Sequence, residues 1–519
     1  MTDINPILKT DYPDPDVIRV GDTYYMVSTT MYYMPGGIIL RSYDLAHWEI
    51  VTYLYDALDG TPQERLEEGK TNYGKGMWAP SFRYHNGRFY VAFVSHGRED
   101  THLFVADDIM GPWEHRHIGE YFHDCSLLFD DDGKVYIASG NMNIRVTELN
   151  DDLTNVRPGG VDKVIIRDNP ELVGLGYEGS HFYKINGKYV LTLIHWPKSS
   201  GRRTEAVFIS DTVDGDYVGR DVMWDDMGLN NMGVAQGGLV DTPDGKTYAI
   251  LFRDSGAVGR VPVLMPVEWE DGFPVFGKDG LVPRNPELYP TKENYSYESL
   301  YTSSFGRREN SSTEMVNNKS LMLQWQWNHV PDNDLWNILE GDRLWIKTGA
   351  VSVNPTKARN ILTQRMMLPR CEAKVTIDGS GLGDGDSAGF MALEGRYVML
   401  GISKRNGRYY LRKLARTVVE KPYAIGFPDD LPGEVLYERE IESPIITVKL
   451  SADFEGMKDE LITELLDMES GLSERIGEPF HMSFGLDHFT GVRFGLCVFS
   501  EETPGGEAVF RDFEYLYNA

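Results

Sequence analysis

The sequence is short of cysteine and of long apolar runs. Its three cysteines, Cys125, Cys371 and Cys497, are widely spaced in 519 residues and form neither a zinc-binding pattern nor a disulfide framework. No apolar segment reaches the length of a membrane span, and the N-terminus lacks the basic start and apolar run of a signal peptide. These absences predict a cytoplasmic protein.

Basic residues are also in deficit. Acidic residues outnumber them by 79 to 51, which gives a formal net charge of −28. Nucleic acids and anionic membranes would repel such a surface, so neither is an expected partner. We expect a neutral partner instead, and the sequence leaves a homo-oligomer open.

Helical periodicity is missing as well, because no stretch repeats apolar residues at i, i+3 and i+4 over a useful length. What recurs is an apolar run, a turn with glycine and a run rich in Tyr, Phe and Val, which is typical of a β-hairpin. The unit occurs five times, around Gly21, Gly87, Gly133, Gly187 and Gly245. Repeats of about 50 residues built from short strands indicate propeller blades, so five hairpins predict five blades.

The chain is too long for one hydrophobic core, and the repeat stops well before its end. We predict an all-β protein with a five-bladed β-propeller over residues 1–295, and a linker with a β-sandwich over residues 296–519. In "CEAKVTID", Ala373, Val375 and Ile377 alternate with polar residues, as in a strand with one buried face.

Tryptophans are frequent near the start of the second domain. Trp325, Trp327 and Trp336 could form a sugar-binding platform or pack in a core. Packing is the commoner use of Trp in β-domains, so we expect these side chains in the core.

Equivalent positions in successive blades face the same mouth of a propeller. Counting nine residues back from the turn glycine gives Trp78, Asp124, Glu178 and Gln236, and seven residues back in the first repeat gives Asp14. Three of the five are therefore carboxylic acids from distant segments. Like charges at one place destabilise one another, so their gathering indicates chemistry or cation binding.

Glycoside hydrolysis is the chemistry that this set of side chains suits. One carboxyl group protonates the leaving oxygen, and the other activates water or attacks the sugar. A third acid can tune the pair. A ring such as that of Trp78 offers a flat apolar wall for a sugar.

At these residues the sequence resembles glycoside hydrolase family 43. The matching motifs follow the family's order from about residue 5 to 275: "YPDPDVIRVGDTYYM", "GMWAPSFRYHNGRFYV", "HDCSLLFDDDGKVYI", "YEGSHFYKINGKYVLT" and "GAVGRVPVLMPVEWEDGFPV". The resemblance implies a five-bladed propeller and hydrolysis with inversion of the anomeric configuration.

The resemblance also implies residue roles. Asp14 would be the general base, Glu178 the general acid, and Asp124 the residue that orients this acid and modulates its pKa. Arg260 would hydrogen-bond sugar hydroxyls or Asp124. Since an inverting enzyme must accommodate a water molecule, we expect the carboxyl groups of Asp14 and Glu178 to lie about 6.5 to 9.5 Å apart.

Many family members hold a central calcium ion with a histidine at the position of Gln236. The amide oxygen of Gln236 could still bind Ca²⁺, which prefers oxygen ligands. Such an ion would have a structural or supporting role, and we expect no cofactor for the chemistry itself.

The C-terminal part resembles the β-sandwich of the family's β-xylosidase-like branch, including the phrase "HFTGVRFGLCV". In that branch a loop of the sandwich covers the propeller mouth and contributes a Phe, which is Phe489 here. A lid of this kind leaves a pocket for a chain end. Tyr32 and Tyr33, in "MYYMPGG", are candidates for the wall near the bound sugar.

The expected protein is an exo-acting, inverting glycosidase that releases terminal β-D-xylose, α-L-arabinofuranose or both from neutral xylan- or arabinose-containing oligosaccharides. An endo-arabinanase is an alternative, but it conflicts with the expected lid. A non-catalytic sugar-binding propeller would not need three crowded carboxylates. A fructan-cleaving hydrolase would carry "NDPNG" where this chain has "YPDPD".

Overall fold

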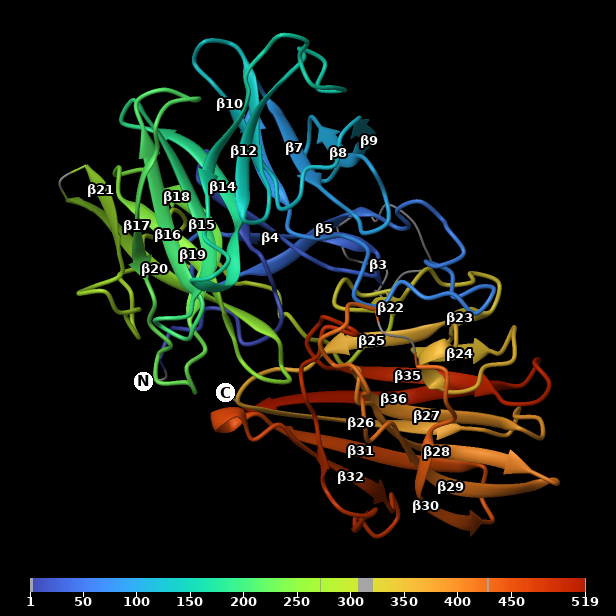
Figure 1. The fold of residues 1–519 in the computed structure, drawn as a ribbon. Coiled ribbons are helices and arrows are strands. Elements are labelled where there is room, and N and C mark those ends of the chain that lie inside the picture. The colour runs from blue at the N-terminus through green and yellow to red at the C-terminus, as the bar shows by residue number, and fades with distance from the viewer. Residues whose placement is uncertain (1–2, 271, 307–320, 427–428, 519) are drawn as a thin grey trace.

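The computed structural model describes residues 3–270, 272–306, 321–426 and 429–518. Five four-stranded antiparallel sheets form a propeller, and two larger sheets form a sandwich beside it (Figure 1). The predicted all-β architecture of a five-bladed propeller followed by a β-sandwich is thus confirmed. No helix in these described ranges has the length and apolar character that a membrane span requires.

Each blade is built from four strands in chain order. Their bounds are, in blade one, β1 (Asp16–Val20), β2 (Thr23–Ser28), β4 (Gly36–Ser42) and β5 (Glu49–Tyr55); in blade two, β6 (Ser81–His85), β7 (Arg88–Phe93), β8 (Thr101–Ala106) and β9 (Glu114–Ile118); in blade three, β10 (Ser126–Phe129), β11 (Val135–Ser139), β12 (Asn143–Leu149) and β13 (Asp162–Arg167); in blade four, β14 (Val173–Ile185), β15 (Lys188–Pro197), β16 (Thr204–Ser210) and β17 (Val218–Met223); and in blade five, β18 (Val234–Asp241), β19 (Thr247–Asp254), β20 (Arg260–Glu270) and β21 (Phe273–Phe276).

The first two strands of every blade form the predicted hairpin. All five turn glycines adopt a left-handed φ, between 61° and 84°, which glycine tolerates without steric cost. Asn86 and Asn186, which precede two of these glycines, adopt φ values of 49° and 52°. This Asn-Gly combination favours the tight turn that matches the twist of paired strands.

The N-terminal segment runs along blade five before it enters blade one. The backbone N–H of Ile7 donates to the carbonyl of Pro262 at 3.0 Å, and that of Tyr12 donates to the carbonyl of Arg260 at 2.9 Å. The first and last blades are therefore joined by backbone hydrogen bonds, which bring the segment before β1 next to Arg260.

The sandwich consists of two sheets, with one 3₁₀ turn in each of two connections. One sheet has the order β3 (Tyr33–Met34), β22 (Gln326–Asn328), β25 (Ile361–Arg365), β35 (Arg493–Ser500), β27 (Asp386–Leu393), β28 (Val398–Arg405), β29 (Arg408–Ala415) and β30 (Glu434–Ile441). The other has the order β23 (Trp336–Leu339), β24 (Arg343–Lys347), β36 (Glu507–Asn518), β26 (Arg370–Asp378), β31 (Ile445–Asp453), β32 (Glu460–Leu466) and β33 (Ser473–Arg475), and β34 (Phe480–His481) also pairs with β32. The 3₁₀ turns are η1 (Pro355–Lys357) and η2 (Glu455–Met457).

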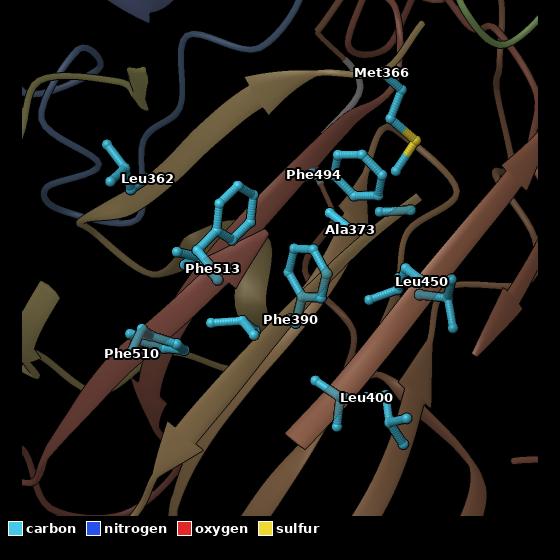
Figure 2. Close-up of a cluster of buried hydrophobic side chains, with 14 of the residues drawn as sticks. Leu362, Met366, Ala373, Phe390, Leu400, Leu450, Phe494, Phe510 and Phe513 are labelled. Carbon is cyan, nitrogen blue, oxygen red and sulfur yellow. The ribbon is translucent and has the colours of Figure 1, made fainter. Parts of the chain in front are cut away.

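Side chains from both sheets fill one core, and Figure 2 shows Phe390, Phe494, Phe510 and Phe513 packed within it. The alternation predicted for β26 is present, since its Ala and Val positions point into this core. Thr376, whose side chain points to the other face of β26, is buried too. Its hydroxyl lies 2.9 Å from that of Thr447, so this buried polar group has a hydrogen-bond partner.

The three tryptophans of this domain lie in the same core. Trp325, Trp327 and Trp336 are only 2–3% exposed, so the prediction that they pack is confirmed. The three cysteines are buried and free, as expected for packing residues.

One strand of the sandwich comes from the propeller region of the chain. β3 lies between β2 and β4 in sequence, yet it pairs with β22, where Met34 is opposite Trp327 and Tyr33 is opposite Asn328. The two domains therefore share a continuous sheet (Figure 1).

Candidate active site

Unusual backbone conformations occur at the predicted acids. Asp14 and Asp124, which precede β1 and β10, have φ values of 51° and 46°, a region that residues with side chains seldom occupy. Glu178 and Gln236 lie at register shifts within β14 and β18. Bulges of this kind re-aim side chains and are common beside active sites.

Asp14 is 4% exposed and fully engaged. One carboxylate oxygen accepts a hydrogen bond from the guanidinium of Arg260 at 2.8 Å, and the other accepts one from the hydroxyl of Thr29 at 2.8 Å. Arg260 is itself buried, so this is a charge-assisted pair shielded from water. Both groups hold the Asp14 carboxylate in one orientation.

Asp124 and Glu178 lie on either side of a histidine. The Nε2 atom of His123 is 3.8 Å from the Asp124 carboxylate and 3.4 Å from that of Glu178. The backbone N–H of Gly179 donates to Asp124 at 3.1 Å, and the amide of Asn141 donates to Glu178. The structure thus brings the predicted pair together and adds two neighbours to it.

Burial and charge set the protonation of this cluster. Burial raises the pKa of Asp124 to about 7; the charge of His123 opposes this rise, whereas those of Glu178 and Asp14 add to it. Burial lowers the pKa of His123, but the carboxylates of Asp124 and Glu178 outweigh it and raise the pKa to about 9. A proton therefore remains available beside Glu178 near neutral pH.

Aromatic rings lie beside the acids. The ring of Trp78 lies 5.9 Å from that of Phe489 and 6.0 Å from that of His123, centroid to centroid. The guanidinium carbon of Arg260 lies 4.8 Å from the centroid of the Phe489 ring. Contacts thus run from Asp14 through Arg260, Phe489, Trp78 and His123 to the acid pair, so the structure brings these predicted residues together.

Phe489 comes from the sandwich, on the connection between β34 and β35. Asp11 ties this connection to the propeller, because its carboxylate accepts hydrogen bonds from the backbone N–H of Gly491 at 2.9 Å and of Arg260 at 2.8 Å. One buried carboxylate therefore ties the connection that carries Phe489 to the backbone of Arg260.

Tyr32 and Tyr33 do not face an open pocket. Both are 0% exposed; they belong to the cluster that Trp78 and Phe489 pack against. The guanidinium of Arg493 covers the ring of Tyr33, and the hydroxyl of Tyr32 lies 3.2 Å from that of Thr490. A fully buried ring has no surface to offer a sugar, so these residues support the wall from behind.

A calcium ion at Gln236 stays a prediction. Its backbone N–H donates to the buried carboxylate of Glu205 at 2.7 Å, and its side chain packs against Gly179. Nearby, the buried Asp16 already pairs with Arg83 at 2.7 Å.

Two residues of the site were missed by the repeat count. His123 directly precedes Asp124 in the sequence, so it could have been predicted to lie near the acids. Asn141 follows β11, the second strand of blade three, and reaches Glu178 across the blade boundary. The count covered only the first strand of each blade, so it gave no signal for Asn141.

We expect Asp124→Asn to change how stability depends on pH. Between about pH 4 and pH 7 folded Asp124 keeps a proton that the unfolded chain has released, so the contribution of this carboxyl group to stability falls as pH rises through this window. Asn has no such step. The variant should therefore gain up to a few kcal/mol over wild type between these pH values, measured by urea unfolding.

The same substitution at the exposed Asp216 provides the control for this measurement. Equal pH dependence in wild type and Asp124→Asn would contradict the assignment of the retained proton to Asp124.

Comparison with known proteins agrees with this geometry. A family model described as glycosyl hydrolases family 43 matches residues 4–274, and one described as the beta xylosidase C-terminal concanavalin A-like domain matches residues 316–516. A beta-xylosidase of Formosa agariphila is 26% identical, over 100% of this chain and 90% of its own. A non-reducing end alpha-L-arabinofuranosidase of Bacteroides ovatus is also 26% identical, over 78% of this chain and 76% of its own.

A solved structure, a bifunctional GH43-CE protein of Bacteroides eggerthii, has a TM-score of 0.87 and 35% identity. The alignment covers 99% of this chain, which spans 64% of the length of that protein. The propeller model alone covers more than half of the sequence and includes the converging acids. The chain therefore belongs to glycosyl hydrolase family 43.

Proposed function

We propose that the protein is an exo-acting, inverting glycosidase that releases terminal β-D-xylose, α-L-arabinofuranose or both from xylan- or arabinose-containing oligosaccharides. The observation that carries this proposal is the single site in which three propeller acids meet an aromatic lid residue from the sandwich. A β-xylosidase and an α-L-arabinofuranosidase among the relatives support the choice of sugars.

In this mechanism Asp14 is the general base. Its pairing with Arg260 and Thr29 favours a fixed carboxylate that can take a proton from water. The activated water attacks the anomeric carbon from the face opposite the leaving group. A separation of about 6.5–9.5 Å between the carboxyl groups of Asp14 and Glu178 would accommodate this water.

Glu178 is the general acid and protonates the leaving oxygen. Its side chain is 18% exposed, which suits a group that must meet the substrate, whereas the side chain of Asp124 is 8% exposed. The proton retained on Asp124 near pH 7 and the contacts from His123 and Asn141 support Asp124 as the group that orients and tunes the acid.

The lid supports exo action. Phe489 packs edge-on against Trp78 and under Arg260, so aromatic surface closes one side of the mouth. A closed side leaves room for a chain end but obstructs a long polymer that passes through. Tyr32 and Tyr33 hold this wall by packing behind it.

The test uses the products of one substrate. The wild-type enzyme should convert xylotetraose first to xylose and xylotriose, as measured by chromatography. In proton NMR, the released xylose should appear first as the α anomer. Release from the para-nitrophenyl glycosides of β-D-xylopyranose and α-L-arabinofuranose ranks the two sugars. Early xylobiose would contradict exo action, and a first-formed β anomer would contradict inversion.

A further inference from the structure

Three histidines gather on the outer half of blade two, away from the catalytic acids. His102 lies on β8, and His115 and His117 lie on β9, the outermost strand. The strand register puts His102 opposite His117. One nitrogen of each imidazole lies within 4.8 Å of the others.

The imidazole nitrogens face one another because packing orients the rings. His102 stacks on Phe93 with 5.1 Å between ring centroids, and His115 stacks on Phe104 with 4.3 Å. The ring edges are thereby turned inward, and Nδ1 of His102 lies 2.9 Å from Nε2 of His115.

Two polar groups flank the cluster. The hydroxyl of Ser95 lies 3.0 Å from Nε2 of His102, on the side away from His115. The carboxylate of Asp100 lies 3.2 Å from Nδ1 of His117, a buried nitrogen with no well-formed hydrogen bond in the described structure. Hydroxyl and carboxylate groups in such positions are typical partners of metal-binding histidines.

We propose that His102, His115 and His117 bind one divalent transition-metal ion of the zinc class. Three imidazoles with a fourth position open to water are a common donor set for Zn²⁺. With bonds of about 2.0–2.1 Å in a tetrahedral arrangement, ligand nitrogens lie about 3.3 Å apart. The ion would replace the proton of the 2.9 Å hydrogen bond between His102 and His115, and the three nitrogens, now within 4.8 Å of one another, would adjust to this spacing. His115 and His117 reach the surface, which gives the ion an entry path.

The ion would brace the wall of the active site. Ser95, which contacts His102, also forms a β-bridge with Met77, and the carbonyl of Val94 accepts a hydrogen bond from the backbone N–H of Trp78 at 3.0 Å. His96 stacks on the Trp78 ring at 5.0 Å. Metal binding would therefore stiffen the segment that backs Trp78.

The test is a calorimetric titration of Zn²⁺ into metal-free protein. All variants are made in a parent protein that carries Glu178→Gln. This substitution removes one of the three side chains of a second cluster that could bind a metal, which consists of His123, Asp124 and Glu178. We expect one ion per chain, at least tenfold weaker binding after His117→Ala, and no binding after His115→Ala with His117→Ala. His481→Ala, at an exposed histidine of β34, should bind like the parent.

Thermal unfolding supplies a second readout. Zn²⁺ should raise the melting temperature of the parent and of His481→Ala but not that of the double variant, since only a ligand of the folded state stabilises it. The proposal is overturned if the parent binds no ion, or if the double variant binds as many ions with the same affinity. Melting curves without metal check that the variants fold.

Discussion

Glu178→Gln should slow the hydrolysis of xylobiose by about 10²- to 10⁴-fold, the usual contribution of a general acid. A xylose alkoxide is a poor leaving group and needs the proton that Glu178 would donate. Gln keeps the size of the side chain and an oxygen to accept the hydrogen bond from Asn141, so the site should keep its shape. The measurement is kcat/KM for xylobiose.

A second substrate identifies the role. Para-nitrophenolate leaves with little protonation, so Glu178→Gln should lose much less activity on para-nitrophenyl β-D-xylopyranoside than on xylobiose. Glu171→Gln, at an exposed position shortly before β14, is the matched control and should behave as wild type. Equal losses on the two substrates would assign Glu178 a different role.

Asp14→Asn should lower kcat/KM about 10²- to 10⁴-fold, as expected for Glu178→Gln on xylobiose. The loss should be nearly equal on xylobiose and on para-nitrophenyl β-D-xylopyranoside. The base activates water, and this need does not depend on the leaving group. Asn tolerates the left-handed φ of 51° that Asp14 adopts, so the backbone should be retained. The measurement is kcat/KM on xylobiose and on the para-nitrophenyl glycoside.

Asp22→Asn, in the exposed turn of the same hairpin, controls for the chemical change. An Asp14→Asn enzyme that keeps wild-type kcat/KM would refute the base assignment. A loss confined to xylobiose would instead point to a part in leaving-group departure. The two variants together thus separate the two carboxylates by their dependence on the leaving group.

The propeller was predictable because each blade repeats one local signal. Every hairpin turn has a glycine with positive φ. This glycine lies at a nearly constant sequence distance from the start of the inner strand, so it locates that strand in each repeat. The pairing of β3 with the sandwich sheet was not predictable. A strand of two residues, Tyr33–Met34, is too short to show a pattern that would identify its partner strand nearly 300 residues away.

The acids of the site were predictable for the same reason, but their neighbours were only partly so. Asn141 follows the second strand of its blade, and the hydrogen bond that the N–H of Gly491 donates to Asp11 joins residues 480 positions apart. Such contacts depend on how blades and domains pack, which the repeat does not encode. Tyr32 was expected near the sugar, yet its aromatic character serves packing, because an interdomain junction also needs large apolar side chains.

The strand shared by the two domains limits how family members can exchange parts. Cutting the chain after blade five would strip β3 of its partner and leave the open edge of β22's sheet without Tyr33 and Met34. Unpaired sheet edges invite aggregation. A sandwich transplanted to another propeller would therefore need a compatible β3 in its new host, so the two domains should be engineered together.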